Sequence, residues 1–155
     1  MTASQEHPIR LRRACMEDAP LLLAWRNDPE TRKASITGHE ILVEEHMAWL
    51  RTLLKDNNRE LFMVLIGKRP IGTVRRERHE TGFELSWTVC PDFRGKGLGK
   101  KMVRTLAQST RGTVTARIKK DNARSVGIAE HAGMTLQREE NGILIYERKG
   151  LDNGP

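Results

Sequence analysis

Cysteine, aromatic residues and long apolar runs are all scarce in this sequence of 155 residues. The two cysteines, Cys15 and Cys90, cannot form a disulfide framework, and no cysteine–histidine cluster has the spacing of a zinc site. The longest apolar run, residues 61–66, is far shorter than the roughly 20 residues that span a membrane. The first residues also lack the basic and apolar segments of a secretory signal. These absences predict a cytoplasmic protein with no metal site and no membrane association.

Positive charge exceeds negative charge, because 27 lysines and arginines stand against 20 acidic residues and give a net charge of +7. Such a field attracts anions, whether nucleic acids or phosphorylated small molecules. Single-stranded nucleic acid is usually held by aromatic side chains interleaved with basic ones. Here three Trp, three Phe and one Tyr are scattered along the chain. The composition therefore disfavours nucleic acid and favours a basic enzyme with anionic ligands.

The pattern of apolar residues predicts strands and helices within one domain, residues 1–155, with a tail from about residue 150. Strands are predicted over residues 9–12, 61–66, 71–76, 83–90, 114–118, 136–139 and 143–148. Helices are predicted over residues 17–27, 43–54, 98–111 and 121–133. The buried face of the second helix is predicted from helical spacing to comprise Val43, Met47, Leu50 and Leu54. This order predicts an α/β fold with a mixed, largely antiparallel sheet flanked by helices.

A glycine-rich basic loop, Arg-Gly-Lys-Gly-Leu-Gly over residues 94–99, lies between the strand 83–90 and the helix that follows it. Alternating glycines let the backbone approach a ligand, and the helix that starts there adds a partial positive charge. Arg94, Lys96 and Lys100 add whole charges. The spacing differs from that of dinucleotide-binding and Walker loops. The loop therefore predicts an anion site suited to a pyrophosphate, with a plain turn as the alternative interpretation.

Residues 89–99 resemble the signature loop of the GNAT acetyltransferase superfamily, R-x-x-G-x-G. Residues 122–125 followed by 132–134 resemble that family's N-x-x-S/A…G-F segment, and the order of elements matches over nearly the whole chain. The resemblance implies a GNAT-like acyl-CoA N-acyltransferase fold with acetyl-CoA as the donor. The cofactor-binding residues that it implies are Thr88, Val89, Arg94, Gly95, Lys96, Gly97, Leu98, Gly99, Lys100, Asn122 and Ser125.

The same resemblance implies that the strand ending at Val89 splays from the strand 114–118, and that the pantetheine arm pairs with the backbone of Thr88 and Val89 in the gap. Transfer of acetyl directly to a primary amine needs a base, and Glu84 is the candidate; a solvated strand residue is the alternative interpretation. A backbone N–H near Val89 or Cys90 is expected to stabilise the oxyanion. Ala129 occupies the position of the family's usual tyrosine acid. Tyr146, the only tyrosine, is the remaining candidate, and protonation of the thiolate by water is the alternative.

The acceptor amine is expected to lie against the N-terminal third of the chain. Its pattern over residues 25–50, W-R-N-D-P-x-x-R…S…H-x-x-W-L, resembles the branch that acetylates amino-sugar nucleotides for pseudaminic and legionaminic acid synthesis. It resembles the ribosomal-protein N-terminal acetyltransferases less specifically. The predicted acceptor contacts are Arg26, Asn27, Arg32 and His46. Ordinary charge on a helix surface is the alternative interpretation of these basic residues.

Three hypotheses about function follow from the sequence. The first is acetylation of an amine on a small, anionic acceptor such as an amino-sugar nucleotide. The second is acetylation of protein N-termini or of other small amines. The third is a module without catalytic activity that binds acetyl-CoA or nucleic acid, which the alanine at position 129 keeps open. The protein is expected to act as a monomer or a homodimer.

Overall fold

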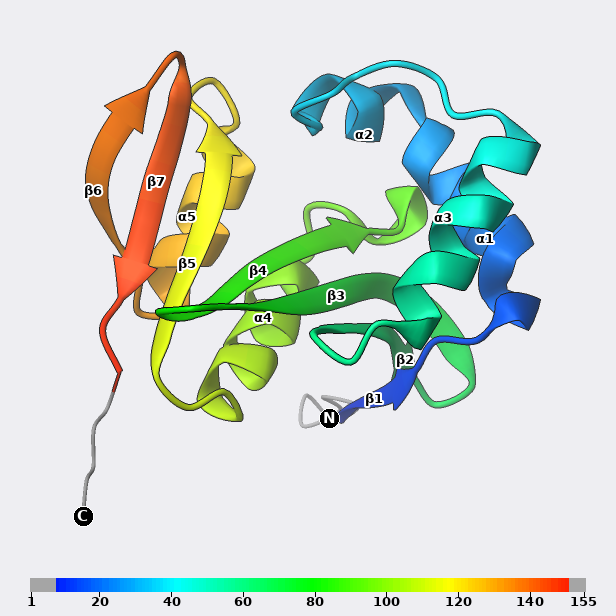
Figure 1. Ribbon diagram of the computed structural model, residues 1–155, viewed down its shortest axis with the longest axis horizontal. Helices are drawn as coiled ribbons and strands as arrows, with labels where there is room; N and C mark the ends of the chain where they lie inside the picture. Colours follow the sequence, from blue (N-terminus) through cyan, green and yellow to red (C-terminus); the bar gives the residue numbers. More distant parts are fainter. Residues whose placement is uncertain (1–7, 151–155) are drawn as a thin grey trace.

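A seven-stranded sheet forms the centre of the computed structural model, which describes residues 8–150 (Figure 1). The predicted tail therefore lies outside the described residues from position 151 onward. The strands run in the order β1-β2-β3-β4-β5-β7-β6, and every neighbouring pair is antiparallel except β4 and β5. The strands are β1 Ile9–Arg13, β2 Arg59–Ile66, β3 Arg69–His79, β4 Gly82–Val89, β5 Thr113–Lys119, β6 Thr135–Glu140 and β7 Ile143–Arg148. The predicted fold class is confirmed.

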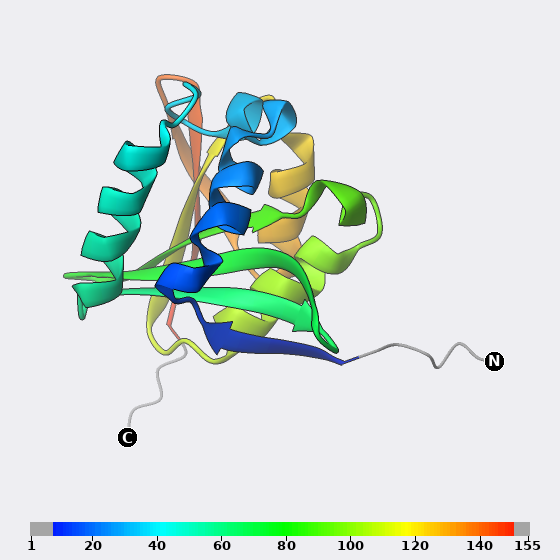
Figure 2. The ribbon, with the colours of Figure 1, turned by 90° about the vertical axis from the view of Figure 1, so that its right-hand side faces the viewer.

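Helices cover both faces of this sheet (Figure 2). They are α1 Ala19–Asn27, α2 Pro29–Ala34, α3 Val43–Lys55, α4 Leu98–Gln108 and α5 Ala123–His131, with short 3-10 helices at Met16–Asp18 and Pro91–Phe93. On one face α1 and α3 pack through Trp25 and Leu50 onto Met63 of β2. On the other face α4 and α5 pack through Met102 and Ile128 onto the opposite side of the sheet.

Two features of the N-terminal helices differ from the sequence prediction. The helix α2 was not expected; the side chain of Asp28 accepts a hydrogen bond from the backbone N–H of Thr31 (3.0 Å), and Pro29 occupies the first turn, so the chain restarts a helix at once. The buried face of α3 was predicted in part. Leu50 is fully buried, and Met47 and Leu54 pack partly buried against the same core. The fully buried set also includes His46 and Leu53, whereas Val43 is 62% exposed.

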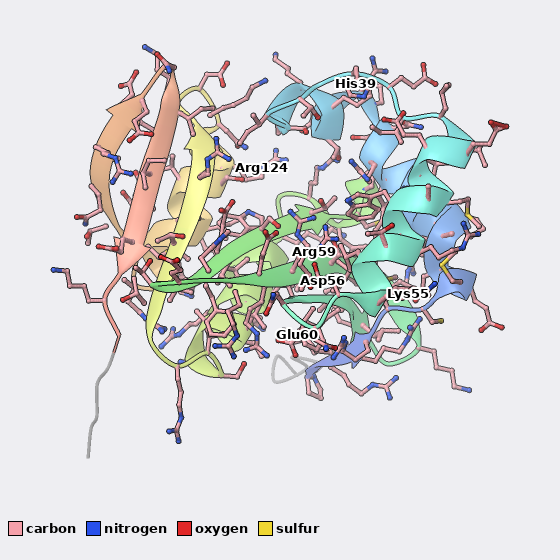
Figure 3. The ribbon with its side chains drawn as sticks, in the orientation of Figure 1. His39, Lys55, Asp56, Arg59, Glu60 and Arg124 are labelled. Atoms are coloured by element: carbon pink, nitrogen blue, oxygen red, sulfur yellow. The ribbon has the colours of Figure 1, made fainter. Side chains whose placement is uncertain are left out.

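The end of α3 is fixed by a local cluster of side chains around Asp56. Its carboxylate accepts from the backbone N–H of Asn58 (2.8 Å) and from Nε of Arg59 (2.9 Å), which turns the chain into β2 (Figure 3).

No helix within residues 8–150 has the length and apolar character needed to cross a bilayer. Within the same residues, no three His, Cys, Asp or Glu side chains are grouped as a metal site requires.

The parallel strands β4 and β5 are paired only at one end. Their register is Gly82 with Thr113, Phe83 with Val114 and Glu84 with Thr115, and beyond these pairs the strands diverge. Figure 1 shows them forming a V whose open side faces α2. The splay implied by the family resemblance is therefore present, and it leaves one edge of β4 without a strand beside it.

Candidate active site

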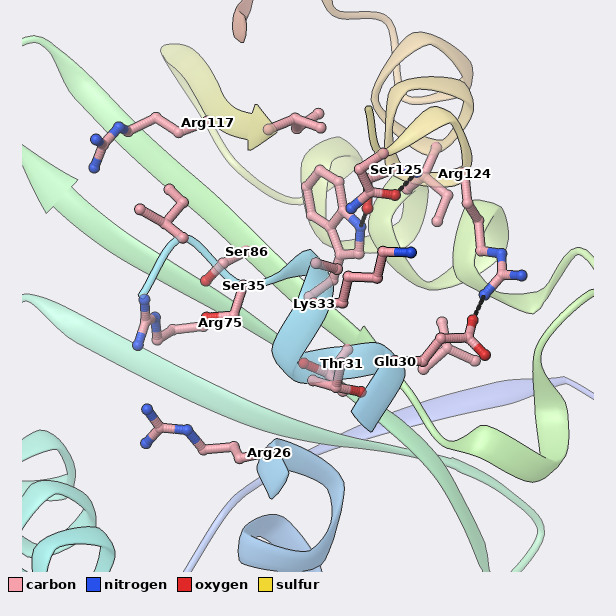
Figure 4. Close-up of a pocket in the computed structure, with 18 of the residues that line it drawn as sticks. Arg26, Glu30, Thr31, Lys33, Ser35, Arg75, Ser86, Arg117, Arg124 and Ser125 are labelled. Atoms are coloured by element: carbon pink, nitrogen blue, oxygen red, sulfur yellow. Dashed lines mark hydrogen bonds and ion pairs between the residues drawn. The ribbon is translucent and has the colours of Figure 1, made fainter. Parts of the chain in front are cut away.

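A cleft of about 820 Å³ occupies the space between the diverging strands and the helices above them (Figure 4). Its walls come from residues 84–89 of β4, residues 117–118 of β5, the first turn of α5, and the segment 30–37 that contains α2. These walls come from distant parts of the sequence, so the cleft depends on the tertiary fold.

The strand register decides which backbone groups of β4 face the gap. The N–H of Cys90 donates to the carbonyl of Ile71 on β3 (2.8 Å), and antiparallel strands alternate between residues bonded to the partner and residues turned away. The backbone of Thr88 is therefore turned toward β3, while those of Trp87 and Val89 face the gap. This corrects the prediction that the backbone of Thr88 pairs with pantetheine, and it leaves Val89 rather than Cys90 as the source of an oxyanion N–H.

The glycine loop follows β4 and opens α4. Gly97 is the N-cap of α4 in the left-handed conformation (φ 76°), and Gly95 has φ 77°. A Cβ built on either glycine has no neighbour within 4 Å, so backbone conformation and not crowding requires glycine there. Gly99 differs, because its Cβ would lie 2.7 Å from Cδ1 of Ile128. Open glycines at a helix N-terminus form a cradle that fits a pyrophosphate.

Arg94 makes contacts within the protein that the sequence did not indicate. Its Nη2 donates to Oδ2 of Asp28 and to Oγ1 of Thr31, both at 2.7 Å, so its guanidinium joins the loop to α2. Burial opposes ionisation of Asp28, but hydrogen bonds from Arg94 and Thr31 outweigh burial and lower the pKa of this carboxyl. Arg94 also lines the cleft, so its contact with the cofactor stays a prediction. Lys96 and Lys100 are exposed beside the glycines.

The helix α2 lies across the mouth of the cleft and is bonded on both sides. Arg94 holds its first turn from the side of β4. From the other side, Arg124 of α5 forms an ion pair with Glu30 (3.2 Å), and Nζ of Lys119 on β5 donates to the carbonyl of Lys33 (2.8 Å) (Figures 3 and 4). The helix thus connects the two arms of the V.

Asn122 and Ser125 line the cleft where α5 begins. Oδ1 of Asn122 caps the helix by accepting from the backbone N–H of Ser125 (3.1 Å). Oγ of Ser125 in turn accepts from Nε1 of Trp87 on β4 (3.2 Å). These bonds place both predicted residues in the cleft wall and connect that wall to β4.

Glu84 lies on the floor of the cleft, close to the point where β4 and β5 separate. Its side chain shares one face of β4 with Ser86 and Thr88, is 29% exposed and lies 3.4 Å from Nε2 of His79. A half-buried carboxylate in this position can accept a proton from a ligand in the cleft.

Tyr146 does not reach the cleft. It is 3% exposed within the core beneath α5 and is absent from the cleft walls. Burial and the nearby Glu130 raise the pKa of its phenol. Ala129 is fully buried, so no acid projects from that position either. The prediction of Tyr146 as a catalytic acid is therefore corrected.

The predicted acceptor residues separate into one that lines the cleft and three that do not. Arg26 lines it and stacks over the ring of Trp49 (4.3 Å). Asn27 instead holds the following loop, because its side chain bonds both the N–H (2.7 Å) and the carbonyl (2.8 Å) of Ile41. Arg32 lies outside the lining. Asn27 is therefore corrected to a structural position, and Arg32 to a position outside the cleft.

Three arginines in the cleft were not predicted as site residues from the sequence, namely Arg75 of β3, Arg117 of β5 and Arg124 of α5. The alternation within each strand indicates which side chains share a face, but only the pairing of the strands brings these two faces together. No motif in the sequence signals them.

His46, the fourth predicted acceptor residue, is fully buried between α1 and α3. Neither ring nitrogen makes a hydrogen bond of normal geometry. Burial first, and then the charge of Arg26, lower the pKa of His46 below 6.5, and the backbone of Ala19 offsets this only in part. His46 is therefore corrected from a substrate contact to a core residue.

This environment makes stability depend on pH. The unfolded chain binds a proton at His46 more readily than the folded one, so stability present above pH 6.5 is lost as the pH falls. We expect urea unfolding to show a smaller loss of stability between pH 7.5 and pH 5.5 in His46→Leu than in the parent protein. The slopes of the free energy of unfolding against pH should differ between the two proteins by up to about 1.4 kcal/mol per pH unit. The other histidines are common to both proteins, so equal slopes would contradict the assignment.

Comparison with known proteins agrees with this geometry. Residues 9–135 match the family of the acetyltransferase (GNAT) domain. The acetyltransferase PseH of Campylobacter jejuni is 25% identical over 130 residues, which are 80% of this chain and 81% of that protein. A domain from Methanocaldococcus jannaschii superposes with a TM-score of 0.81 at 24% identity, over 92% of this chain and 98% of that one. The aminoglycoside acetyltransferase AAC(6')-Ib in complex with coenzyme A gives a TM-score of 0.78 at 17% identity, over 92% and 95%. The chain thus belongs to the GNAT acetyltransferase family, whose members take the acetyl group from acetyl-CoA.

Proposed function

We propose that the chain acts as one domain, residues 1–155, that transfers acetyl directly from acetyl-CoA to a primary amine. The observation that carries this proposal is the V between β4 and β5, which begins at a carboxylate and ends at a glycine cradle. The backbone of Val89 faces the gap, Asn122 and Ser125 line its far wall, and Glu84 lies on its floor. Donor and acceptor can therefore meet in this gap.

In the proposed mechanism the residues of the cleft position the amine and move its proton. Acetyl-CoA supplies a thioester that is activated toward nucleophiles. The amine nitrogen attacks the carbonyl carbon, so a C–N bond forms as the C–S bond breaks. Glu84 lies five residues before Val89, about 17 Å along β4, so it accepts the proton from nitrogen through a chain of waters, while the N–H of Val89 donates to the oxygen that becomes negative. Solvent water protonates the released thiolate, since neither Ala129 nor Tyr146 supplies an acid in the cleft.

The finer identity of the acceptor rests on the N-terminal third of the chain. The sequence resemblance over residues 25–50 supports an amino-sugar nucleotide, and the relative PseH is an acetyltransferase. Protein N-termini and other small amines are the second candidate. One wall of the cleft is formed by α2 and the loop that follows it.

A titration of the protein with acetyl-CoA, followed by a turnover assay with a panel of amines, tests the proposal. Binding of acetyl-CoA with release of coenzyme A only when an amine is present supports direct transfer. Binding without turnover on any amine would favour the module without catalytic activity. Absence of binding would contradict the proposed function altogether.

A further inference from the structure

Lys33 is the one lysine whose side chain lies in the cleft. All nine lysines of the chain fall within residues 8–150, and among them only Lys33 belongs to the cleft walls. Its side chain is exposed and forms none of the hydrogen bonds or ion pairs found within those residues. A primary amine without a partner is thus present in the space that the proposed function assigns to acetyl transfer.

The backbone at Lys33 is fixed at the mouth of the cleft. Nζ of Lys119 on β5 donates to the carbonyl oxygen of Lys33 (2.8 Å), near the end of α2. At the start of α2, Nη2 of Arg94 donates to the carboxylate of Asp28 (2.7 Å). A six-residue helix that is bonded at both ends projects its side chains in fixed directions. The position of the amine therefore does not depend on a loop that must first become ordered.

The side of α2 that carries Lys33 faces the cleft between the glycine loop and α5. Residues three apart on a helix lie on one side of it, so Lys33 shares the side of Glu30. The carboxylate of Glu30 lies 3.2 Å from Nη1 of Arg124 on α5 and 3.4 Å from Nη1 of Arg94 in the loop. Figure 4 shows the side chain of Lys33 extending from α2 toward the start of α5. The amine therefore points into the cleft and not to the outer surface.

The place proposed for the reacting carbonyl belongs to the same part of the cleft. The N–H of Val89 is the proposed donor to the oxyanion, and Val89 lines the cleft together with Lys33. Arg94 follows Val89 by five residues and forms its ion pair on the side of α2 that carries Lys33. Across the gap, Nε1 of Trp87 on β4 donates to Oγ of Ser125 on α5 (3.2 Å). The four-carbon stem of a lysine is flexible, so its amine can reach a carbonyl in this narrow space.

We propose that Lys33 is a site of self-acetylation, whose amine takes the acetyl group from the donor held in the same molecule when no acceptor is bound. In that step Nζ, in its neutral form, attacks the carbonyl carbon of the thioester, so that a C–N bond forms and the C–S bond breaks. Of the two protons that the ammonium group loses, one ends on the released thiol and the other in solvent. The inference rests on the proposed function, because the donor must bind in the V.

Incubation of the protein with acetyl-CoA and no added amine, followed by mass spectrometry of its peptides, tests the proposal. Lys33 should gain one acetyl group about 100-fold faster than Lys55 and Lys68, which are exposed outside the cleft. The rate constant should not change when the protein is diluted, because amine and donor belong to one molecule. Release of coenzyme A should stop after a single turnover, in contrast to the steady release that an added amine supports.

Matched variants identify the amine that reacts. Lys33→Arg keeps the positive charge but removes the primary amine, so release of coenzyme A without an added amine should fall to the rate of spontaneous hydrolysis. Lys55→Arg makes the same substitution at an exposed lysine of α3 and should leave the single turnover unchanged.

A measurement without enzymatic transfer checks the geometry. Succinimidyl acetate acetylates exposed lysines directly, so its reaction with each lysine reports how accessible that amine is. Coenzyme A bound in the V should protect Lys33 from this reagent and leave Lys55 unprotected.

The outcomes separate this inference from the proposed function. Equal acetylation of Lys33 and Lys55 by acetyl-CoA, a rate that rises with protein concentration, or no protection by coenzyme A overturns the inference. Turnover of an added amine while Lys33 stays unmodified also overturns it and leaves the proposed function standing. Absence of acetyl-CoA binding contradicts the proposed function itself, and the inference with it.

Discussion

Replacing Glu84 by glutamine should lower kcat about 100-fold or more, with little change in the KM for acetyl-CoA. The amide keeps the shape of the side chain but cannot accept the amine proton. In Glu84→Gln the logarithm of kcat should continue to rise with pH beyond the plateau of the parent enzyme, because only amine already deprotonated by solvent reacts. Steady-state release of coenzyme A across a range of pH measures both effects.

Glu77 offers a matched control for this substitution. It lies directly opposite Glu84 on β3, has the same side chain on the same face, and does not line the cleft. Glu77→Gln should therefore keep kcat within about twofold. Unchanged turnover in Glu84→Gln, or an equal loss in both variants, would remove Glu84 from the role of base.

Replacing Gly72 by alanine should reduce the free energy of unfolding by about 3 kcal/mol. A Cβ on Gly72 would lie 2.4 Å from the carbonyl oxygen of Thr88 and 2.7 Å from Cε of Met102. The methionine can move aside, but the carbonyl belongs to the backbone of β4 and moves only with the strand. That strand forms one wall of the cleft, so we also expect weaker binding of acetyl-CoA. Urea unfolding and titration with acetyl-CoA measure the two losses.

Gly127 provides the opposite case. It lies inside α5, and the atom nearest to a Cβ built on Gly127 is Cε of Lys100, at 3.9 Å. Gly127→Ala should therefore raise the free energy of unfolding by about 0.5 to 1 kcal/mol, because alanine favours the helix. Similar destabilisation in both alanine variants would show that crowding at Gly72 is not the cause.

The sequence was sufficient to predict those strands, helices and loops whose own residues carry a local pattern. The alternation over residues 83–90 predicted both the strand and the face that holds Glu84. The loop 94–99 with Asn122 indicated the acetyltransferase family, which the family match confirms. The helix α2 was missed because an Asp-Pro pair stops one helix and starts the next equally well. On α3, helical spacing predicted Leu50 correctly but not the burial of His46, because a titratable side chain gives no signal of a core position.

The remaining errors concern partners that lie far apart in the sequence. Arg94 has a cationic side chain beside a predicted anion site, and nothing local to it indicates that Asp28 accepts its hydrogen bond. Arg75 and Arg117 come to line the same cleft only through the pairing of β3 with β4 and of β4 with β5. These long-range contacts are set by tertiary packing, so they can be identified only when the strand register is known.

The short pairing of β4 with β5 also has a consequence for cooperative unfolding. Three residue pairs bond β4 to β5, so the two halves of the sheet are held together mainly by side chains, namely the shared core, the bond of Trp87 to Ser125 and the ion pair of Glu30 and Arg124. Strands paired over so few residues separate locally at a lower free energy than the whole molecule unfolds. Under the proposed function, a donor bonded to the backbone of Val89 would act as the missing strand and stabilise the folded protein by mass action. The supply of acetyl-CoA in the cell would then govern how long the protein resists proteolysis as well as how fast it works.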